Sequence, residues 1–308
     1  MKLTNKYNLP EPIVMALGFD SYDKGKSDFS TTELIGPPKA SILRRRHWNE
    51  LEEDVSTRVW AMSGQVKHLI IERVAKLMPD RFIAEQRFYR EISGKLVGGQ
   101  IDLYDKQDKT LYDMKETKVW KVTKGDMTEW VAQGNINRFL CGDEFEIEHI
   151  KNIAFLKDWT DRDTGQDGYP QTPVVCVPLE MWSTEKTEAY LTERVRLHHN
   201  YMQLPDDSIP PCSREERWEG AEKWKVKQKD AARAIKSYPD EENPDPKAAE
   251  RNAQQKAFEQ NSKPKSKGGY EVLHFPATPT RCLRFCSANT FCNFYQTQVK
   301  GKFTDSEE

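Results

Sequence analysis

Alternating polar and apolar residues mark a hairpin near the middle of the chain. The segments Leu96–Tyr104 and Thr110–Thr117 have the two-residue period of strands, and the polar turn Asp105–Lys109 joins them. Antiparallel pairing about a turn centred between Gln107 and Asp108 sets the register of the two strands. The sequence therefore predicts a two-stranded unit from residue 96 to residue 117.

The segments on either side of the hairpin predict further helices and strands. A helical period is found over residues 48–78, 126–140 and 183–202, whereas 81–92 and 150–156 have the composition of strands. In the first helix His68 shares a face with Gly64, which is expected to permit close approach of another backbone. The order helix, three strands, helix, strand predicts an α/β fold with a mixed central sheet flanked by helices, and not a doubly wound parallel sheet.

The hairpin brings several charged side chains together. Its register places Asp102 directly opposite Asp113, and Lys115 lies on the same face as Asp113. Directly opposed side chains lie roughly 4.5–5.5 Å apart at Cβ, where two carboxylates repel each other unless a cation lies between them. A metal site with an adjacent lysine is one interpretation. A surface hairpin with solvated charges is the other, and the hairpin alone does not separate the two.

Composition restricts the classes of protein that fit the chain. Its 308 residues suffice for one large domain or two smaller ones, and the net charge of −2 limits nucleic-acid contact to local basic surfaces. No apolar run approaches a membrane span and the first residues lack a signal-peptide core, so a cytoplasmic protein is expected. Six cysteines in such a chain favour metal ligands, cluster ligands or buried thiols over disulfides.

Changes in composition along the chain predict four regions. They are an irregular N-terminal arm at 1–40, a core at 41–205, a cysteine-bearing region at 206–300 and a disordered tail at 301–308. Within the third region, residues 237–269 are rich in Pro, Glu, Lys, Gln and Ser, which predicts a linker or an exposed helix with loops. The basic run Arg44–His47 is consistent either with a solvated helix start or with a phosphate contact.

A capping box and a lysine-rich strand follow the core. Ser213–Glu216 has the S-x-x-E pattern, so a helix is expected to start there. Alternation over Lys223–Lys229 places four lysines on one face of a strand and Trp224 and Val226 on the other. That pattern suits either a solvated edge strand or a surface that follows a DNA backbone.

Four cysteines of the C-terminal third form one candidate set. They are Cys212, Cys282, Cys286 and Cys292, a number of thiolates that suits a [4Fe–4S] cluster or a zinc ion. Zinc knuckles more often use C-x2-C pairs, so the C-x3-C-x5-C spacing of the last three favours the cluster. Cys141 and Cys176 lie outside this set and are expected to be buried thiols.

Four motifs follow one another within roughly residues 29–160. They are Gly64-x3-His68-x3-Glu72, GGQIDLYD with Asp102, Asp113-Met114-Lys115, and Gln133 in the next helix. In this order they resemble the PD-(D/E)xK nuclease superfamily, in particular its RecB/Cas4-like branch, which implies a restriction-endonuclease-like core. With LIGPPK, FLKDWTDRD and the cysteine-bearing C-terminus, the wider chain resembles phage and prophage members of that branch. Asn137 departs from the pattern, because it stands where the family's tyrosine usually falls.

The resemblance implies a metal site and a reaction. The implied ligands of a Mg²⁺ or Mn²⁺ ion are His68, Asp102, Asp113 and the backbone carbonyl of Met114, and the implied catalytic residues are Asp102, Asp113, Lys115 and Gln133. The metal would activate a water, Lys115 would stabilise the transition state, and Gln133 would position the lysine or the scissile phosphate. Glu72 and Glu85 are further candidates, for which structural salt bridges are the expected role.

The resemblance also implies a cofactor, a substrate and a partner. Cas4-like nucleases carry a cluster on one remote and three C-terminal cysteines, so the four cysteines would hold a [4Fe–4S] cluster. The family spacing is commonly C-x2-C-x5-C with the remote cysteine before the core, and this chain departs from both features. The implied activity is a Mg²⁺- or Mn²⁺-dependent deoxyribonuclease, an exonuclease on linear DNA ends in phage recombination, replication or DNA processing. A phage single-strand annealing or replication protein is an expected partner; a non-cleaving DNA-end-binding module and a zinc-stapled endonuclease are the alternatives.

Overall fold

The structure, a computed structural model, divides into two compact units, Met1–Ile209 and Pro210–Glu308. It describes residues 1–20, 23–229, 231, 233–240, 245–263 and 269–303. Parts of the predicted linker and tail, at 241–244, 264–268 and 304–308, lie outside the described residues. Within the described part of the chain, no helix combines the length and the apolar composition that a membrane crossing requires.

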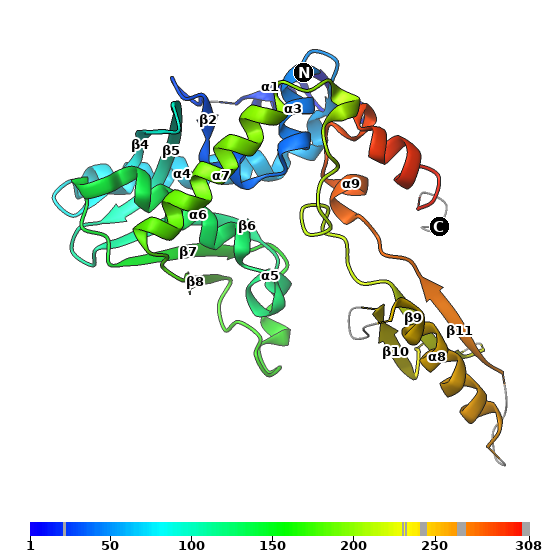
Figure 1. Cartoon of the computed structure of the whole chain (residues 1–308). Coiled ribbons are helices and arrows are strands. Elements are labelled where there is room, and N and C mark those ends of the chain that lie inside the picture. Colours follow the sequence, from blue (N-terminus) through cyan, green and yellow to red (C-terminus); the bar gives the residue numbers. More distant parts are fainter. Residues whose placement is uncertain (21–22, 230, 232, 241–244, 264–268, 304–308) are drawn as a thin grey trace. The chain divides into compact units, whose positions relative to one another are not determined.

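A mixed six-stranded sheet forms the centre of the first unit (Figure 1). Its strands lie in the order β2 (Phe29–Ser30), β5 (Lys95–Asp105), β6 (Thr110–Thr117), β7 (His149–Leu156) and β8 (Val174–Pro178), and β4 (Phe82–Ile92) also pairs with β5. The pairs β2–β5 and β6–β7 are parallel, whereas β4–β5, β5–β6 and β7–β8 are antiparallel.

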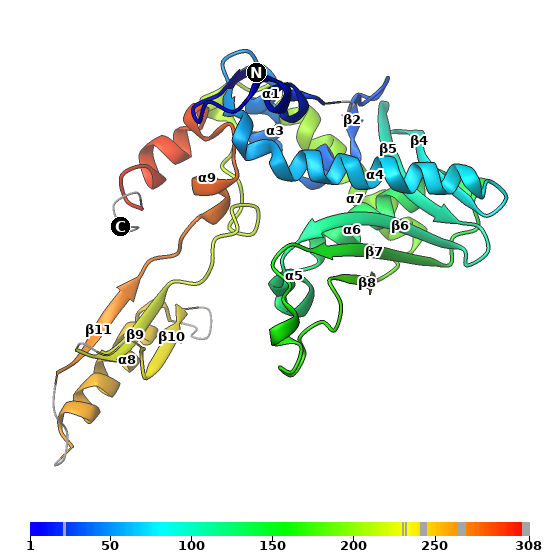
Figure 2. The same ribbon diagram turned by 180° about the vertical axis from the view of Figure 1, so that it is seen from behind.

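Helices cover both faces of this sheet, as the two opposite views show (Figures 1 and 2). α4 (Val59–Leu77) lies on one face, and α6 (Thr128–Cys141) and α7 (Thr184–Tyr201) lie on the other. Ile136 of α6 and Leu191 of α7 are fully buried in one core with Ile101 of β5. The unit also contains β1 (Lys2–Thr4), α1 (Glu11–Gly18), α2 (Thr31–Ile35), α3 (Pro38–Arg46), β3 (Glu52–Asp54) and α5 (Val119–Lys124). The predicted α/β architecture with a mixed central sheet flanked by helices is confirmed.

The central hairpin has the predicted register. Leu103 pairs with Tyr112, and continuing that register would place Asp102 opposite Asp113. Pairing between β5 and β6 ends at Leu103, however, so Asp102 lies just beyond the last paired residues. The ladder between the two strands thus ends one pair before the position where the two aspartates were expected to meet.

Glycine allows β5 to lie close to its neighbours. A Cβ added to Gly99 would lie 2.6 Å from Asn137 Oδ1 and 2.6 Å from Thr31 Oγ1, which no side chain tolerates without movement. Asn137 is therefore a packing residue that supports β5. By contrast, a Cβ added to Gly64 would meet nothing within 4 Å, so the expectation that this glycine permits close approach of another backbone is wrong.

The N-terminal residues are more regular than their composition predicts. Residues 1–40 contribute β1, α1, β2 and α2, and Phe29 and Leu34 are buried in the main core, so the interpretation as an irregular arm is wrong. The helix predicted over 48–78 begins only at Val59, because residues 52–54 pair with β1 and residues 55–58 form a 3₁₀ turn. Long-range pairing in both cases overrides the local pattern.

The basic run lies at the end of α3 rather than at the start of a helix. Arg45 forms an ion pair with Glu33 at 2.6 Å, and Arg46 forms one with Asp206 at 2.5 Å. Cationic side chains at this end of a helix also interact favourably with its dipole. Arg45 and Arg46 are therefore engaged within the protein, and the run is not a solvated helix start.

The second unit contains a small antiparallel sheet. β9 (Lys223–Gln228) lies between β10 (Lys236–Pro239) and β11 (Tyr270–Phe275), so its interpretation as an edge strand is wrong. α8 (Pro246–Asn261) packs against the sheet through three alanines: Ala249, Ala253 and Ala257. The described part of 237–269 thus contains a packed helix in place of the expected linker or exposed helix.

The capping box forms without a helix. Ser213 Oγ accepts a hydrogen bond from the Glu216 N–H at 3.2 Å, and the Ser213 N–H donates to a Glu216 carboxylate oxygen at 3.0 Å. The box closes a turn that contains Trp218 at φ +51°, and no helix follows in the described stretch 214–222. The predicted helix at this position is therefore wrong, because a capping box satisfies a turn as well as it starts a helix. Near the C-terminus, α9 (Thr280–Arg284) is followed by short helical turns.

Candidate functional site

A polar cleft with a volume of about 680 Å³ lies in the first unit. It is lined by side chains of α4, β4, β5 and α6 together with the segment from residue 23 to residue 32. The polar side chains that line it include Gln65, His68, Glu72, Glu85, Arg87, Gln100, Asp102 and Gln133. Three of the predicted site residues, His68, Asp102 and Gln133, therefore face a common space.

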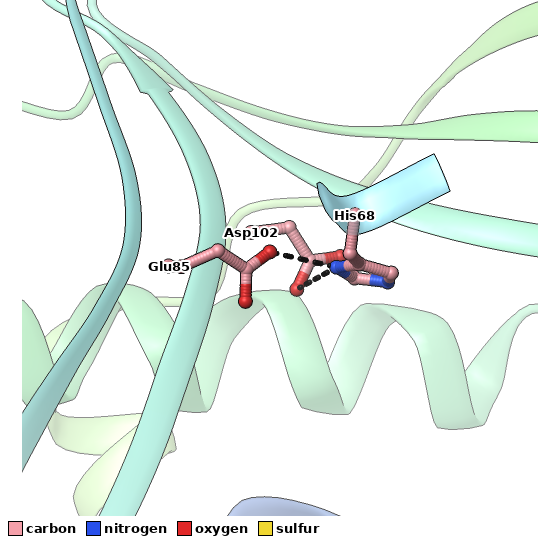
Figure 3. A group of neighbouring side chains, drawn as sticks. All are labelled: His68, Glu85 and Asp102. Carbon is pink, nitrogen blue, oxygen red and sulfur yellow. Dashed lines mark hydrogen bonds and ion pairs between the residues drawn. The ribbon is translucent and has the colours of Figure 1, made fainter. Parts of the chain in front are cut away.

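One imidazole and two carboxylates meet in this cleft. His68 Nδ1 lies 2.8 Å from Glu85 Oε1 and 3.8 Å from Asp102 Oδ1 (Figure 3). One ligand atom from each of the three residues lies within 4.8 Å of the other two. A ligand set of carboxylate oxygens and one imidazole nitrogen suits Mg²⁺ or Mn²⁺ better than zinc, because zinc favours nitrogen and sulfur ligands. The three residues are a candidate divalent-cation site.

Glu85 reaches this site through an unusual backbone conformation. Its φ is +53° in the middle of β4, although it is not a glycine. The neighbours of Glu85 pair with β5 in one register, Ala84 with Leu103 and Gln86 with Ile101. That register places Glu85 opposite Asp102, although these two residues themselves do not pair in the ladder. A left-handed non-glycine residue costs on the order of 1–3 kcal/mol and persists where the surroundings over-determine it, often at functional sites.

Gln100 and Arg87 orient the glutamate. Gln100 Nε2 donates a hydrogen bond to Glu85 Oε2 at 2.5 Å, while Glu85 Oε1 contacts His68. Arg87 in turn donates to Gln100 Oε1 at 2.8 Å, which fixes the direction of the amide. Both oxygens of Glu85 are therefore held, one by the amide and one by the imidazole.

Asp113, Lys115 and Gln133 form a second group next to the first. Gln133 Nε2 donates to Asp113 Oδ1 at 2.8 Å, and Gln133 Oε1 accepts from Lys115 Nζ at 2.8 Å. Lys115 Nζ also lies 2.5 Å from Asp113 Oδ2. The backbone N–H of Met114 donates to Asp102 Oδ2 at 2.6 Å, so β6 connects the two groups.

The carboxylates of the cleft outweigh its positive charge. Burial raises the pKa of Asp102 to about 7, the charge of Asp113 adds to this rise, and His68 and Lys115 oppose it. The hydrogen bond to Glu85 raises the pKa of His68 from its ordinary value, against the effect of burial. Where buried carboxylates have too little positive charge around them, a bound cation stabilises their ionised form most strongly.

The structure gathers the predicted ligands only in part. His68 and Asp102 lie together, but Asp113 is outside the group of three and is held by Lys115 and Gln133. Glu85, expected to form a structural salt bridge, takes the third place. Its sequence signal was a lone glutamate within a strand, which reveals neither the positive φ nor the pairing with β5. Glu72 does form the expected salt bridge, to Lys76 at 2.5 Å.

The four candidate cofactor cysteines influence one another in the second unit. Burial raises the pKa of Cys212 to about 12, and Glu216 and the other three thiols add to this rise. Burial also raises the pKa of Cys282 to about 11, with contributions from Cys286 and Cys292. The other three thiols therefore lie within electrostatic range of Cys212. Nevertheless, in the described part of the chain no three of them lie within 4.8 Å of one another.

The two remaining cysteines differ from each other. Cys141 at the end of α6 is buried as expected, and burial raises the pKa of its thiol to about 12. Cys176 is exposed on β8, so the expectation of a buried thiol is wrong there. β8 is the last strand of the sheet, and its alternate residues face outward.

Comparisons with known proteins leave the family open. No family model matches the chain, and no curated protein matches it. Among solved structures, the chain is similar to one described as the crystal structure of SSO0001. The identity is 15%, the TM-score is 0.40, and the alignment covers 60% of this chain and 82% of that one. At this identity and TM-score the likeness supports no conclusion about fold or function.

Proposed function

We propose that the protein is a Mg²⁺- or Mn²⁺-dependent DNA nuclease with a restriction-endonuclease-like core of the PD-(D/E)xK type. The observation that carries the proposal is that the group of His68, Glu85 and Asp102 lies next to the group of Asp113, Lys115 and Gln133. Ligands for a cation beside a fixed lysine are what metal-assisted phosphodiester hydrolysis requires. The resemblance to the RecB/Cas4-like branch, carried by the four motifs, implies DNA as the substrate and an exonuclease as the class of enzyme.

The donor set of the cleft fits the proposed ion. Glu85 and Asp102 offer hard carboxylate oxygens and His68 offers one imidazole nitrogen, so these three residues would hold Mg²⁺ or Mn²⁺. When bound, the ion supplies Lewis acidity at the phosphate and lowers the pKa of a coordinated water. Gln100 keeps Glu85 in position whether or not the site is filled, because it binds the carboxylate oxygen that faces away from His68.

Lys115 is the group that would stabilise the negative charge developing on the phosphate. The lysine is fixed by Gln133 and Asp113, so its ammonium requires little reorganisation when the transition state forms. Gln133 contacts both charged side chains through opposite ends of its amide, which keeps them at a constant separation. The side chains of β6 and α6 thus hold the lysine in place beside the phosphate, while those of α4, β4 and β5 would bind the metal ion.

A structural [4Fe–4S] cluster on the four cysteines belongs to the same proposal. The number of thiolates and the C-x3-C-x5-C spacing of the last three support a [4Fe–4S] cluster over zinc. Within the described stretch 280–303 the buried apolar residues are Ala288 and Val299, so a cluster would fasten a segment that has little core of its own.

Cleavage of linear and circular DNA tests the proposed activity. With Mg²⁺ or Mn²⁺, anaerobically purified protein is expected to degrade end-labelled linear DNA and to leave covalently closed circles intact. Nicking of circles would identify an endonuclease. Absence of cleavage on both substrates would contradict the proposal in favour of a DNA-end-binding module.

Lys115→Ala tests the site itself. Loss of an electrostatic stabiliser typically costs about 10²–10³ in rate, so cleavage should fall by that factor. Lys118→Ala is the matched control, because Lys118 is exposed and lies three residues further along the chain. Equal activity of the two variants would place the catalytic lysine elsewhere.

The metal content of the second unit tests the cluster. Anaerobically purified protein is expected to be brown and to contain iron and acid-labile sulfide in equal amounts. A colourless protein with one zinc per chain would contradict the cluster and favour the zinc-stapled alternative.

A further inference from the structure

The face of the small sheet opposite α8 carries a row of lysines. On β9, Trp224 and Val226 are buried in one cluster with the alanines of α8. Strand alternation therefore places Lys223, Lys225 and Lys227 on the opposite face. Alternate residues of a strand are about 7 Å apart, so the three ammonium groups form a regular line along β9.

β11 adds apolar side chains to the same face. Phe275 and Leu273 lie directly opposite Lys223 and Lys225 in the antiparallel register, so they share their face. Phe275 is 42% exposed, a large fraction for a phenylalanine within a sheet. Lys225 Nζ lies 4.3 Å from the centre of its ring. The lysine row is thus flanked by an accessible aromatic ring.

Carboxylates balance the positive charge of this face only in part. Among the described residues, none of Lys223, Lys225 and Lys227 forms an ion pair, although Glu271 lies opposite Lys227 in the register. Lys109, by contrast, contacts two glutamates at 2.7 Å each. Because the whole protein has a net charge of −2, this row is a local positive surface and not part of a generally basic protein.

We propose that this face of the β9–β10–β11 sheet binds single-stranded DNA, with the lysine row along the phosphates and Phe275 stacked on a base. Proteins that bind single-stranded DNA combine positively charged groups along the phosphates with aromatic rings on which the bases stack. The ring can stack only on a base that is unpaired, which favours a single strand over a duplex. The choice of DNA rests on the proposed nuclease function, since DNA is the substrate proposed for the cleft. Binding itself needs neither the cleft nor its metal.

Fluorescence anisotropy with the full-length, cluster-loaded protein tests the lysines. The probe is a labelled single strand of about 15 nucleotides, in EDTA so that no cleavage occurs. Lys223→Gln with Lys227→Gln removes two charges without touching the ring of Phe275. The slope of log K against log salt should become shallower by about 1.4, since each neutralised phosphate of a single strand contributes about 0.7. Lys247→Gln with Lys256→Gln is the matched control, because both residues lie on α8, which packs on the other face.

Phe275 is tested by a separate readout. Phe275→Ala should weaken single-strand binding by about tenfold with the salt slope unchanged, because stacking is not electrostatic. Phe275→Tyr should restore the affinity, since it keeps the ring. Near-equal binding of duplex and single strand by the unmodified protein would overturn the preference for unpaired bases.

Two further outcomes separate this proposal from the nuclease proposal. Wild-type affinity and salt slope in the β9 double variant, or equal losses in the α8 control, would overturn the DNA-binding face even if the protein cleaves DNA. Conversely, specific loss of binding in the β9 and Phe275 variants would support the face even if no cleavage is found in Mg²⁺ or Mn²⁺. The two proposals can therefore fail independently.

Discussion

Glu85 tests the proposed metal site at the level of one residue. Glu85→Gln keeps the size of the side chain and removes its charge, so the affinity for Mn²⁺ should fall by about tenfold or more. Calorimetric titration of the protein with Mn²⁺ measures this affinity directly. Glu72→Gln is the control, because Glu72 also lines the cleft but pairs with Lys76. An unchanged affinity in Glu85→Gln would remove this residue from the ligand set.

His198 is a buried imidazole outside the site. Its side chain has no exposed surface. The ring packs edge to face with Phe29 at 5.6 Å between centroids. Burial lowers the pKa of His198 to about 4, and the charges of Arg194 and Arg45 act in the same direction. The folded protein therefore holds this histidine in its neutral form.

This histidine should make folding sensitive to acid. The unfolded chain binds a proton near pH 6.5, whereas the folded chain does not until about pH 4, so stability falls as the pH drops through this interval. The shift corresponds to about 3 kcal/mol of unfolding free energy. Between pH 7 and pH 4 the unfolding free energy of His198→Leu, measured by denaturant unfolding, should fall by about 3 kcal/mol less than that of the unmodified protein. His199→Leu, the exposed neighbour, should retain the wild-type dependence; identical profiles for both variants would contradict the assignment.

At the level of elements, two glycines of the sequence motifs, Gly99 and Gly64, have opposite roles. Gly99 in β5 allows Asn137 and Thr31 to approach, whereas Gly64 in α4 borders open space. Gly99→Ala should therefore destabilise the protein by about 1–3 kcal/mol through overpacking. Gly64→Ala should stabilise it by about 1 kcal/mol, because alanine is the better helix former.

Chemical denaturation of the two alanine variants provides the comparison. The midpoint should move to lower denaturant for Gly99→Ala and to higher denaturant for Gly64→Ala, with similar slopes. Loss of stability in Gly64→Ala would indicate that another part of the protein or a partner packs against this position of α4.

At the level of the whole molecule, the two units depend on different sources of stability. The first unit has an extensive core beneath its sheet, whereas the second has a small core of Trp224, Val226 and the alanines of α8. The module that contains this core lies between Cys212 and Cys282 in the chain. Where the chain enters and leaves it, Glu219 pairs with Pro279. Two cysteines of the proposed cluster, Cys212 and Cys282, therefore lie close in sequence to the two ends of the module.

Cys282→Ser should consequently affect one unit and spare the other. Amide exchange in the described part of residues 210–303 should accelerate, because the variant loses one ligand of the proposed cluster, which would stabilise only this unit. Exchange in β4 to β7 should be unchanged. Hydrogen–deuterium exchange read out by mass spectrometry measures both regions in one experiment, with Cys176→Ser as the control. Equal acceleration in both units would contradict their independent stabilisation.

Local periodicity determined much of the central hairpin. Strand alternation and the polar turn predicted β5, β6 and their register, and the spacing of Asp113 and Lys115 on one face follows from the two-residue period. The helices α6 and α7 and the strand β7 were likewise predicted close to their observed bounds. These features depend on interactions between residues near in sequence, which the chain itself displays.

The sequence by itself thus determined the elements of the core and the placement of Asp113, Lys115 and Gln133 on them. Only the tertiary structure decided that β9 lies inside its sheet, that β3 replaces the first turns of the expected helix, and that Glu85 joins His68 and Asp102. The physical reason is the same in each case. These features arise from pairing between strands or side chains distant in sequence, and their free energy depends on which partner is present rather than on the local pattern.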